Sequence, residues 1–234
     1  MTLEIRVLRR ESPDSPAFWQ SFSYTPQSGG ETVATALTHL SQQPSLTDRD
    51  GNPAAPIRWE HSCLQKKCGA CAMVINGRPR LACDARLSEY KGIITLEPLK
   101  KFPVVADLIV DRSILFENLR VMQMWISGPG KVSEKQSDEA YEAARCLQCG
   151  CCLEICPNFY PGGAFFGMAS FVPATRLISV MTPGEQQDIR KNYLKHVYEG
   201  CGKSLACRDI CPAGIDADRL LSKSNAAAVW RRNG

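Results

Sequence analysis

Apolar and polar side chains alternate in short runs over the first hundred residues. Residues 2–9 and 18–24 both follow this two-residue period, and a turn rich in Ser, Pro and Asp separates them. A period of two places alternate side chains on one face of a strand, so the two runs predict a hairpin. Further short strands are predicted at 57–59, 72–75 and 93–97, with a turn at Asn76-Gly77.

One helix is predicted between these strands. Residues 32–40 carry their apolar side chains at helical spacing, and the Pro-, Asp- and Asn-rich stretch 43–56 that follows should be a loop. The resulting order is strand, strand, helix and then strands around a cysteine-containing loop. This order predicts a β-grasp domain.

The pattern changes near residue 104, beyond which we expect no strands. A boundary there predicts an α+β chain of two domains, a β-grasp domain over 1–104 and an all-α domain over 105–234. Helices are expected at roughly 106–125, 135–145, 164–180, 184–198 and 215–230.

Composition narrows the class of protein. The chain has 234 residues, 44% of them hydrophobic and 22% charged, which is typical of soluble globular proteins. No run of 18 apolar residues is present, and the N-terminal segment lacks the apolar core of a signal peptide. We therefore expect a cytoplasmic protein from a bacterium or archaeon. The net charge of +4 is spread along the chain, which disfavours nucleic-acid binding.

Twelve cysteines are the dominant compositional feature. An even number also suits a secreted disulfide framework, but the chain has no secretory signal and is long enough to build a core without disulfides. Zinc would suit isolated Cys-x2-Cys pairs. Structural zinc sites, however, take two separated pairs, whereas here runs of cysteines end in Cys-Pro.

The first cysteine group has the plant-type ferredoxin spacing C-x4-C-x2-C, followed by a fourth cysteine after eleven residues. It predicts a [2Fe–2S] cluster wrapped by the loop 63–71, whose backbone N–H groups point at the sulfurs. Gly69 suits a position where a side chain would crowd that loop. The predicted ligands are Cys63, Cys68, Cys71 and Cys83.

Three neighbouring residues were weighed for a part in this site. Lys66 and Lys67 could raise the potential of the cluster or meet an acidic partner, or they could simply be solvated. His61 precedes the first cysteine by two residues, but four thiolates already complete the ligand set.

The second group reads C-x2-C-x2-C-x3-C-P over 146–157, the spacing of bacterial ferredoxins. Gly150 allows the backbone to pass close to a cluster. In two-cluster ferredoxins the fourth cysteine of such a run binds the other cluster. The motif therefore predicts a partner motif elsewhere in the chain.

That partner lies at 201–212, where the same spacing recurs with Ser204 in the second position. A site with three thiolates favours [3Fe–4S], because the iron without a cysteine is readily lost. Ser204 could instead provide an oxygen ligand, and Cys151 is left over as a small buried residue. The predicted ligands are Cys146, Cys149, Cys152 and Cys211 for [4Fe–4S], and Cys156, Cys201 and Cys207 for [3Fe–4S].

No catalytic residue is predicted in this chain. It has no GxGxxG or Walker motif and no nucleophile elbow, and nothing in the sequence supports a catalytic role for its three histidines, His39, His61 and His196. Three clusters imply transfer of single electrons. The substrate chemistry should then lie on another subunit, with a cofactor that accepts electron pairs.

The motifs at 63–71, 103–111, 146–158 and 201–212 together resemble the iron–sulfur subunit of succinate dehydrogenase and quinol:fumarate reductase, or respiratory complex II. The resemblance covers essentially the whole chain. It implies an α-helical ferredoxin domain after the β-grasp domain, a flavoprotein partner with FAD, and a membrane-anchor cytochrome b-type subunit, often with haem b. It also implies electron transfer between flavin and quinone, a link to the tricarboxylic acid cycle, and a peripheral position on the cytoplasmic face of the bacterial inner membrane.

Two departures concern the quinone. Ubiquinone-using relatives carry Trp soon after the first Cys-Pro and His after the first cysteine of the last motif. Here residues 158–161 read NFYP and Gly202 follows Cys201. This difference favours menaquinone.

Two alternatives to this interpretation stay open. In the first, the same electron-transfer subunit serves a flavoprotein acting on another enoate or acid, or a soluble electron donor. In the second, from a different class of function, the chain is a zinc-stabilised interaction module.

Overall fold

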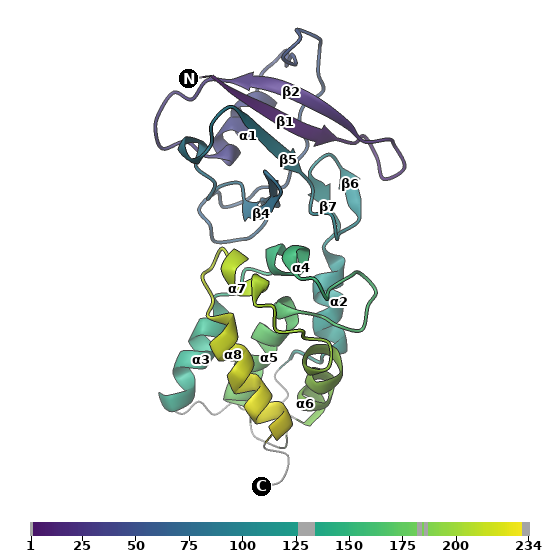
Figure 1. The fold of residues 1–234 in the computed structure, drawn as a ribbon, viewed down its shortest axis with the longest axis vertical. Coiled ribbons are helices and arrows are strands. Elements are labelled where there is room, and N and C mark those ends of the chain that lie inside the picture. Colours follow the sequence, from purple (N-terminus) through teal and green to yellow (C-terminus); the bar gives the residue numbers. More distant parts are fainter. Residues whose placement is uncertain (1, 126–133, 182–183, 185–186, 231–234) are drawn as a thin grey trace. The chain divides into compact units, whose positions relative to one another are not determined.

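The computed structural model describes residues 2–125, 134–181, 184 and 187–230, and the chain divides into two compact units after Asp111 (Figure 1). The N-terminal unit contains a five-stranded sheet of order β2-β1-β5-β3-β4, in which β1 and β5 are parallel and the other pairs are antiparallel. Its strands are β1 (Leu3–Arg9), β2 (Phe18–Tyr24), β3 (Ala72–Ile75), β4 (Arg78–Leu81) and β5 (Ile93–Glu97).

Helix α1 (Val33–Ser41) supplies much of the core of this unit. Thr32 caps it through a reciprocal pair of bonds with Thr35, which satisfies two N–H groups of its first turn. Val33 and Leu37 on its apolar face are fully buried. The predicted β-grasp order is therefore confirmed, as is the turn at Asn76-Gly77, which joins β3 to β4.

Two strand expectations are wrong. Residues 57–59 form no strand, although Ile57 and Trp59 are buried, because the N–H of Arg58 donates to the Asp107 carboxylate at 3.0 Å. Strands also continue past residue 104: β6 (Val104–Ala106) and β7 (Ile109–Val110) form a hairpin.

Asp107 fixes that hairpin within the N-terminal unit. Its buried carboxylate accepts the N–H of Arg10 at 2.9 Å and lies 3.1 Å from Nε of the buried Arg9. Burial would raise the pKa of Asp107, but its hydrogen bonds and Arg9 hold it below its usual value. The helix expected from residue 106 therefore begins only at Ser113.

The described residues of the C-terminal unit form helices joined by loops, with no strand among them. Two predicted helices continue at their C-terminal ends as single π-helical turns, η2 and η3. The elements are α2 (Ser113–Val121), α3 (Glu134–Ala144), α4 (Cys151–Ile155), α5 (Met168–Val180), α6 (Gln187–Tyr193), η2 (Leu194–Tyr198), α7 (Ala206–Ile210), α8 (Ala217–Asn225) and η3 (Ala226–Trp230).

Helix α5 is the centre of this unit, since α3, α4, α6 and α8 all pack against it. Its buried side chains include Phe171, Val172 and Ile178. The short helices α4 and α7, which the sequence did not predict, pack against each other and carry several of the cysteines.

Candidate metal centres

The loop 63–71 in the N-terminal unit curls through left-handed backbone conformations. Leu64, Lys66 and Gly69 have φ values of 52°, 58° and 77°. Residues with positive φ turn consecutive N–H groups toward the inside of a loop. Here the N–H groups of Gln65 and Lys67 each lie 3.3 Å from Cys63 Sγ.

The fourth cysteine of this group enters from beyond β4. The N–H of Lys66 lies 3.3 Å from Cys83 Sγ, and Ala82 N donates to the carbonyl of Cys71 at 3.0 Å. The free thiols of Cys63 and Cys68 are hydrogen-bonded to each other, as are those of Cys71 and Cys83. The structure therefore brings all four predicted [2Fe–2S] ligands together.

These four thiols differ in their surroundings. Cys68 is exposed and Cys71 is buried. Hydrogen bonds from the backbone of Gln65 and Lys67 lower the pKa of Cys63 to about 7, whereas burial raises the pKa of Cys71 to about 12. Lys66 Nζ forms an ion pair with Asp84 at 2.8 Å beside the loop.

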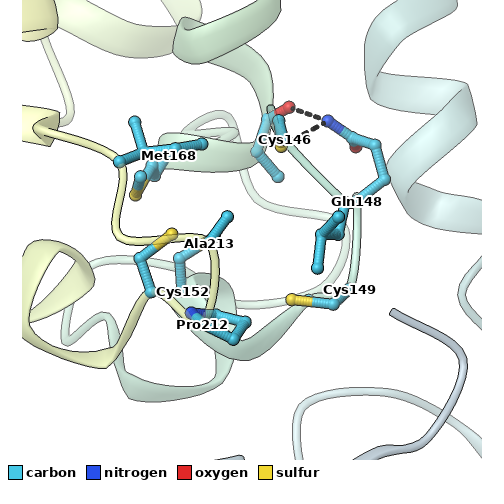
Figure 2. A pocket seen from close by; sticks show the side chains of 12 residues that line it. Cys146, Gln148, Cys149, Cys152, Met168, Pro212 and Ala213 are labelled. Carbon is cyan, nitrogen blue, oxygen red and sulfur yellow. Dashed lines mark hydrogen bonds between the residues drawn. The ribbon is translucent and has the colours of Figure 1, made fainter. Parts of the chain in front are cut away.

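A cavity in the C-terminal unit is lined by Cys146, Cys149, Cys152 and Cys211, the four predicted [4Fe–4S] ligands (Figure 2). It encloses about 350 Å³, part of it open to solvent. Apolar side chains, Met168 and Ile215 among them, form much of the remaining wall. Cys211, which lies 59 positions after Cys152 in the sequence, thus faces the same space as the three cysteines of the 146–157 motif.

The backbone around the cavity explains how the motif places its sulfurs. Gly150 has φ 88° and is the N-cap of α4, so the chain turns sharply between Cys149 and Cys152. Cys151 is fully buried, is not among the lining residues, and hydrogen-bonds to Cys149. That position agrees with the small buried residue expected from the sequence.

Burial dominates the chemistry of these thiols. It raises the pKa of Cys146 to about 11, although hydrogen bonds from the backbone and side chain of Gln148 act in the opposite direction. Cys149 differs, since the bond from Cys151 lowers its pKa to about 7. Four thiols that face one space are the donor set of a [4Fe–4S] cluster.

The third group lies between the ends of α4 and α7. Cys156 is the C-cap of α4, Cys201 follows η2, and Cys207 lies in the first turn of α7. Burial raises the pKa of Cys207 to about 11, and the charges of Cys156 and Cys201 add to this, which shows that the three are neighbours. Ser204 lies on the same loop and is exposed.

Asn158 joins the two loops of this third group. Its Nδ2 donates to the carbonyl of Gly200 at 2.9 Å. A Cβ added at Gly202 would meet the Asn158 amide at 3.2 Å, so the two residues are matched in size.

The donor sets fit iron–sulfur clusters. The first group has four thiols with N–H groups aimed at sulfur, and the second has four thiols around a cavity. Among the residues that the structure describes, no three His, Cys, Asp or Glu side chains are grouped so as to hold a single metal ion. Which thiols bind which cluster stays a prediction.

Comparisons with known proteins agree with this chemistry. Residues 3–117 match a family described as a 2Fe-2S iron-sulfur cluster binding domain, and residues 142–215 match a 4Fe-4S dicluster domain. The succinate dehydrogenase iron-sulfur subunit of Bacillus subtilis is 34% identical over 96% of this chain and 91% of its own. The chain belongs to this family of iron–sulfur subunits.

Further relatives of this succinate dehydrogenase and fumarate reductase family confirm the resemblance. The fumarate reductase iron-sulfur subunit of Haemophilus influenzae is 30% identical over 88% of this chain and 90% of its own. A chain of the Mycobacterium smegmatis Sdh1 complex in the apo form has the same fold, with a TM-score of 0.75 over 99% of this chain and 98% of that one, at 21% identity. The protein is therefore an oxidoreductase subunit, and the predicted fold class is confirmed.

Each of the three histidines contacts an aromatic side chain. His61 packs on Trp59 with ring centroids 4.5 Å apart, and His39 Nδ1 lies 2.9 Å from the Tyr24 hydroxyl. His196 stacks on Phe166 at 4.1 Å, and its Nδ1 lies 2.7 Å from the carbonyl oxygen of Ala164.

One residue at the predicted [4Fe–4S] site was not predicted from the sequence. Gln148 lines the cavity and donates to Cys146 Sγ, as Figure 2 shows. Its position between two predicted ligands was a signal that could have found it.

Within the described residues no helix is long and apolar enough to cross a membrane.

Proposed function

We propose that this chain is the electron-transfer subunit of a membrane-bound succinate dehydrogenase or fumarate reductase. In this proposal it connects the FAD of a flavoprotein subunit with a quinone. The clusters would supply one-electron redox chemistry when bound. The substrate chemistry of succinate and fumarate would belong to the flavoprotein.

The observation that carries the proposal is the cavity lined by Cys146, Cys149, Cys152 and Cys211. The motif at 146–157 and Cys211 of the motif at 201–212 contribute to the same space. This crossing of motifs is the ligand pattern of a two-cluster ferredoxin. It supports the assignment of Cys156, Cys201 and Cys207 to the adjacent [3Fe–4S] centre.

We further propose that the quinone is menaquinone, that it binds on the side of the third cysteine group, and that membrane-anchor subunits cover that side on the cytoplasmic face. The residues around Asn158, after the first Cys-Pro, support the choice of quinone. Gly202 packs against Asn158, so a histidine at 202 would require Asn158 to move. Asn158 is itself held by Gly200, and Tyr160 beyond it is 64% exposed.

The test is an EPR-monitored redox titration of the intact complex, combined with succinate and fumarate assays. We expect three centres, of which a [3Fe–4S] signal is seen in the oxidised protein. Ser204→Cys should convert that centre toward [4Fe–4S], because it restores a fourth thiolate. A complex with three centres but no activity toward succinate or fumarate would point to a flavoprotein with another substrate. A colourless, zinc-containing protein purified without oxygen would refute the cluster assignment.

The quinone is tested separately with the same complex. Electron transfer to a menaquinone analogue should be faster than to a ubiquinone analogue at equal concentrations. A clear preference for the ubiquinone analogue would overturn this part of the proposal and leave the cluster assignment intact.

A further inference from the structure

The side chain of Gln148 folds back over the [4Fe–4S] cavity. The residue lies between Cys146 and Cys149 and has φ 49°, a left-handed conformation that is unfavourable for a non-glycine residue. Its Nε2 donates to Cys146 Sγ, as Figure 2 shows, at a distance of 3.3 Å. The same Nε2 donates to the carbonyl of Ala169 at 2.9 Å. The amide therefore connects a predicted ligand sulfur to helix α5.

Both neighbours of the amide are hydrogen-bond acceptors, which fixes its orientation. A carboxamide has two N–H donors and one carbonyl oxygen, and the reverse orientation would place that oxygen against a sulfur and another carbonyl. With nitrogen toward both acceptors, each N–H has a partner. The NH₂ group is thus the part of the side chain that this site requires.

The same orientation leaves the oxygen of the amide without a hydrogen-bond donor in the described part of the chain. Gln148 Oε1 is buried and has no hydrogen-bond partner among the residues that the structure describes. A buried unsatisfied carbonyl is unfavourable, and an apolar side chain of the same length would avoid it. Simple filling of the cavity wall would favour methionine or leucine, so the presence of glutamine indicates a role for its donors.

We propose that Gln148 is a positioning residue that raises the reduction potential of the [4Fe–4S] cluster by donating its amide hydrogen to the sulfur of Cys146. The inference rests on the proposed function, because it takes Cys146 as a ligand of that cluster. One added electron increases the negative charge on the ligand sulfurs, and hydrogen bonds to charged acceptors are stronger than those to neutral ones. The bond therefore stabilises the reduced state more than the oxidised state, with no proton transferred.

The test is Gln148→Met in the intact complex, which keeps the length of the side chain and removes both donors. We expect the oxidised-to-reduced ratio of the [4Fe–4S] cluster to rise about tenfold at a fixed ambient potential, a fall of about 59 mV in its midpoint. The midpoint of the [2Fe–2S] cluster should not change. An unchanged [4Fe–4S] midpoint would overturn the proposal, since loss of the Ala169 contact alone would weaken retention of the cluster without moving its potential.

Gln123→Met is the matched control. Gln123 also has a left-handed backbone, with φ 56°, and it is not among the residues that line the cavity. The control should leave all three midpoints at their wild-type values. A [4Fe–4S] shift in the control equal to that of Gln148→Met would contradict the role of the Cys146 contact.

A second measurement needs no variant and keeps the proposal testable if Gln148→Met does not assemble. The wild-type complex is labelled with ¹⁵N at the glutamine side-chain amides, and the reduced [4Fe–4S] cluster is studied by pulsed EPR. A ¹⁵N coupling to the cluster supports the proposal, and its absence refutes it. Absence of any [4Fe–4S] signal in the wild-type complex would instead refute the proposed function.

Discussion

The loop 63–71 and the cavity around Cys146 surround their sulfurs in different ways. In the loop the donors to sulfur are backbone N–H groups, and Cys63 and Cys83 are only partly buried. In the cavity a side-chain amide, that of Gln148, donates to Cys146 in addition to a backbone N–H, and burial dominates. Each region also contains one thiol with a pKa of about 7, Cys63 in the loop and Cys149 in the cavity. Burial raises the pKa of a second thiol in each, to about 12 for Cys71 and to about 11 for Cys146.

The difference shows which part of the chain controls each site. Left-handed residues aim the N–H groups of the loop, so its environment depends on the course of the backbone and little on the side chains. The cavity has walls from the segment 146–150, α4, α5 and the segment after α7. Its environment therefore depends on which side chains these segments present. Substitutions should therefore act differently in the two regions.

The largest expected effect is loss of the cavity cluster in Cys211→Ala. The substitution removes one of four thiols that face the cavity, although Cys211 lies far from the 146–157 motif in sequence. The [4Fe–4S] EPR signal and about four irons per complex should be lost, while the [2Fe–2S] signal remains because its four thiols all lie in the N-terminal unit.

Cys151→Ala is the control for that substitution. Cys151 lies within the 146–157 motif, next to the predicted ligand Cys152, but it is fully buried and does not line the cavity. Its variant should keep the [4Fe–4S] signal. If Cys151→Ala lost the cluster and Cys211→Ala kept it, the ligand assignment would have to be reversed.

The second effect concerns thiol reactivity after the clusters are removed. Above pH 7 the thiolate of Cys63 predominates, so alkylation of Cys63 should rise through a midpoint near pH 7 and then level off. Cys71 and Cys146, with pKa values of about 12 and 11, stay almost entirely protonated at pH 7 and should react on the order of a hundred times more slowly than Cys63. Mass spectrometry of iodoacetamide-labelled peptides measures each site.

Cys149 separates acidity from access in that experiment. Its pKa is also about 7, but it is 8% exposed. We expect it to react more slowly than Cys63 at every pH. Equal rates for the two would mean that the cavity opens in the cluster-free chain, and the contrast between the two regions would then belong only to the loaded protein.

The sequence predicted the elements that have a strong local signal. The period-two runs at 2–9 and 18–24, the helix over 32–40 and the Asn76-Gly77 turn each depend on nearby residues, and each is confirmed. The cysteine spacing likewise predicted which four thiols meet at the loop 63–71 and which four line the cavity. Spacing succeeds here because a cluster constrains its ligands to short turns of the chain.

The errors come from interactions between distant residues. Strand 57–59 was predicted from its period, but a buried carboxylate 49 positions away accepts the Arg58 N–H in place of a neighbouring strand. The hairpin of β6 and β7 was missed because Asp107, which makes its turn with φ 45°, is stabilised there by Arg9. Helices α4 and α7, five residues each, are too short to show a helical period. The domain boundary near 104 stays a prediction, and the compact units divide after Asp111.

A smaller effect is expected from Gly69→Ala in the loop. Gly69 has φ 77°, and a residue with a Cβ pays about 1–2 kcal/mol in that conformation. The [2Fe–2S] cluster should be lost at a lower temperature or denaturant concentration, while its potential changes little. Gly30→Ala is the control, because a Cβ there meets nothing within 4 Å and the backbone is not left-handed. Equal loss of the cluster in both variants would argue against backbone control of the loop.

The smallest effect is expected from Lys66→Ala. The substitution keeps the N–H that lies 3.3 Å from Cys83 Sγ and removes only an exposed ion pair with Asp84. Exposed ion pairs contribute about 0–1 kcal/mol, and salt screens the charge of the lysine from the cluster. The oxidised-to-reduced ratio of the [2Fe–2S] cluster should therefore change by about threefold or less at moderate salt, and redox titration at low and high salt measures it. A tenfold change that persists at high salt would show that side chains control the loop as they control the cavity, because a screened surface charge cannot act in that way.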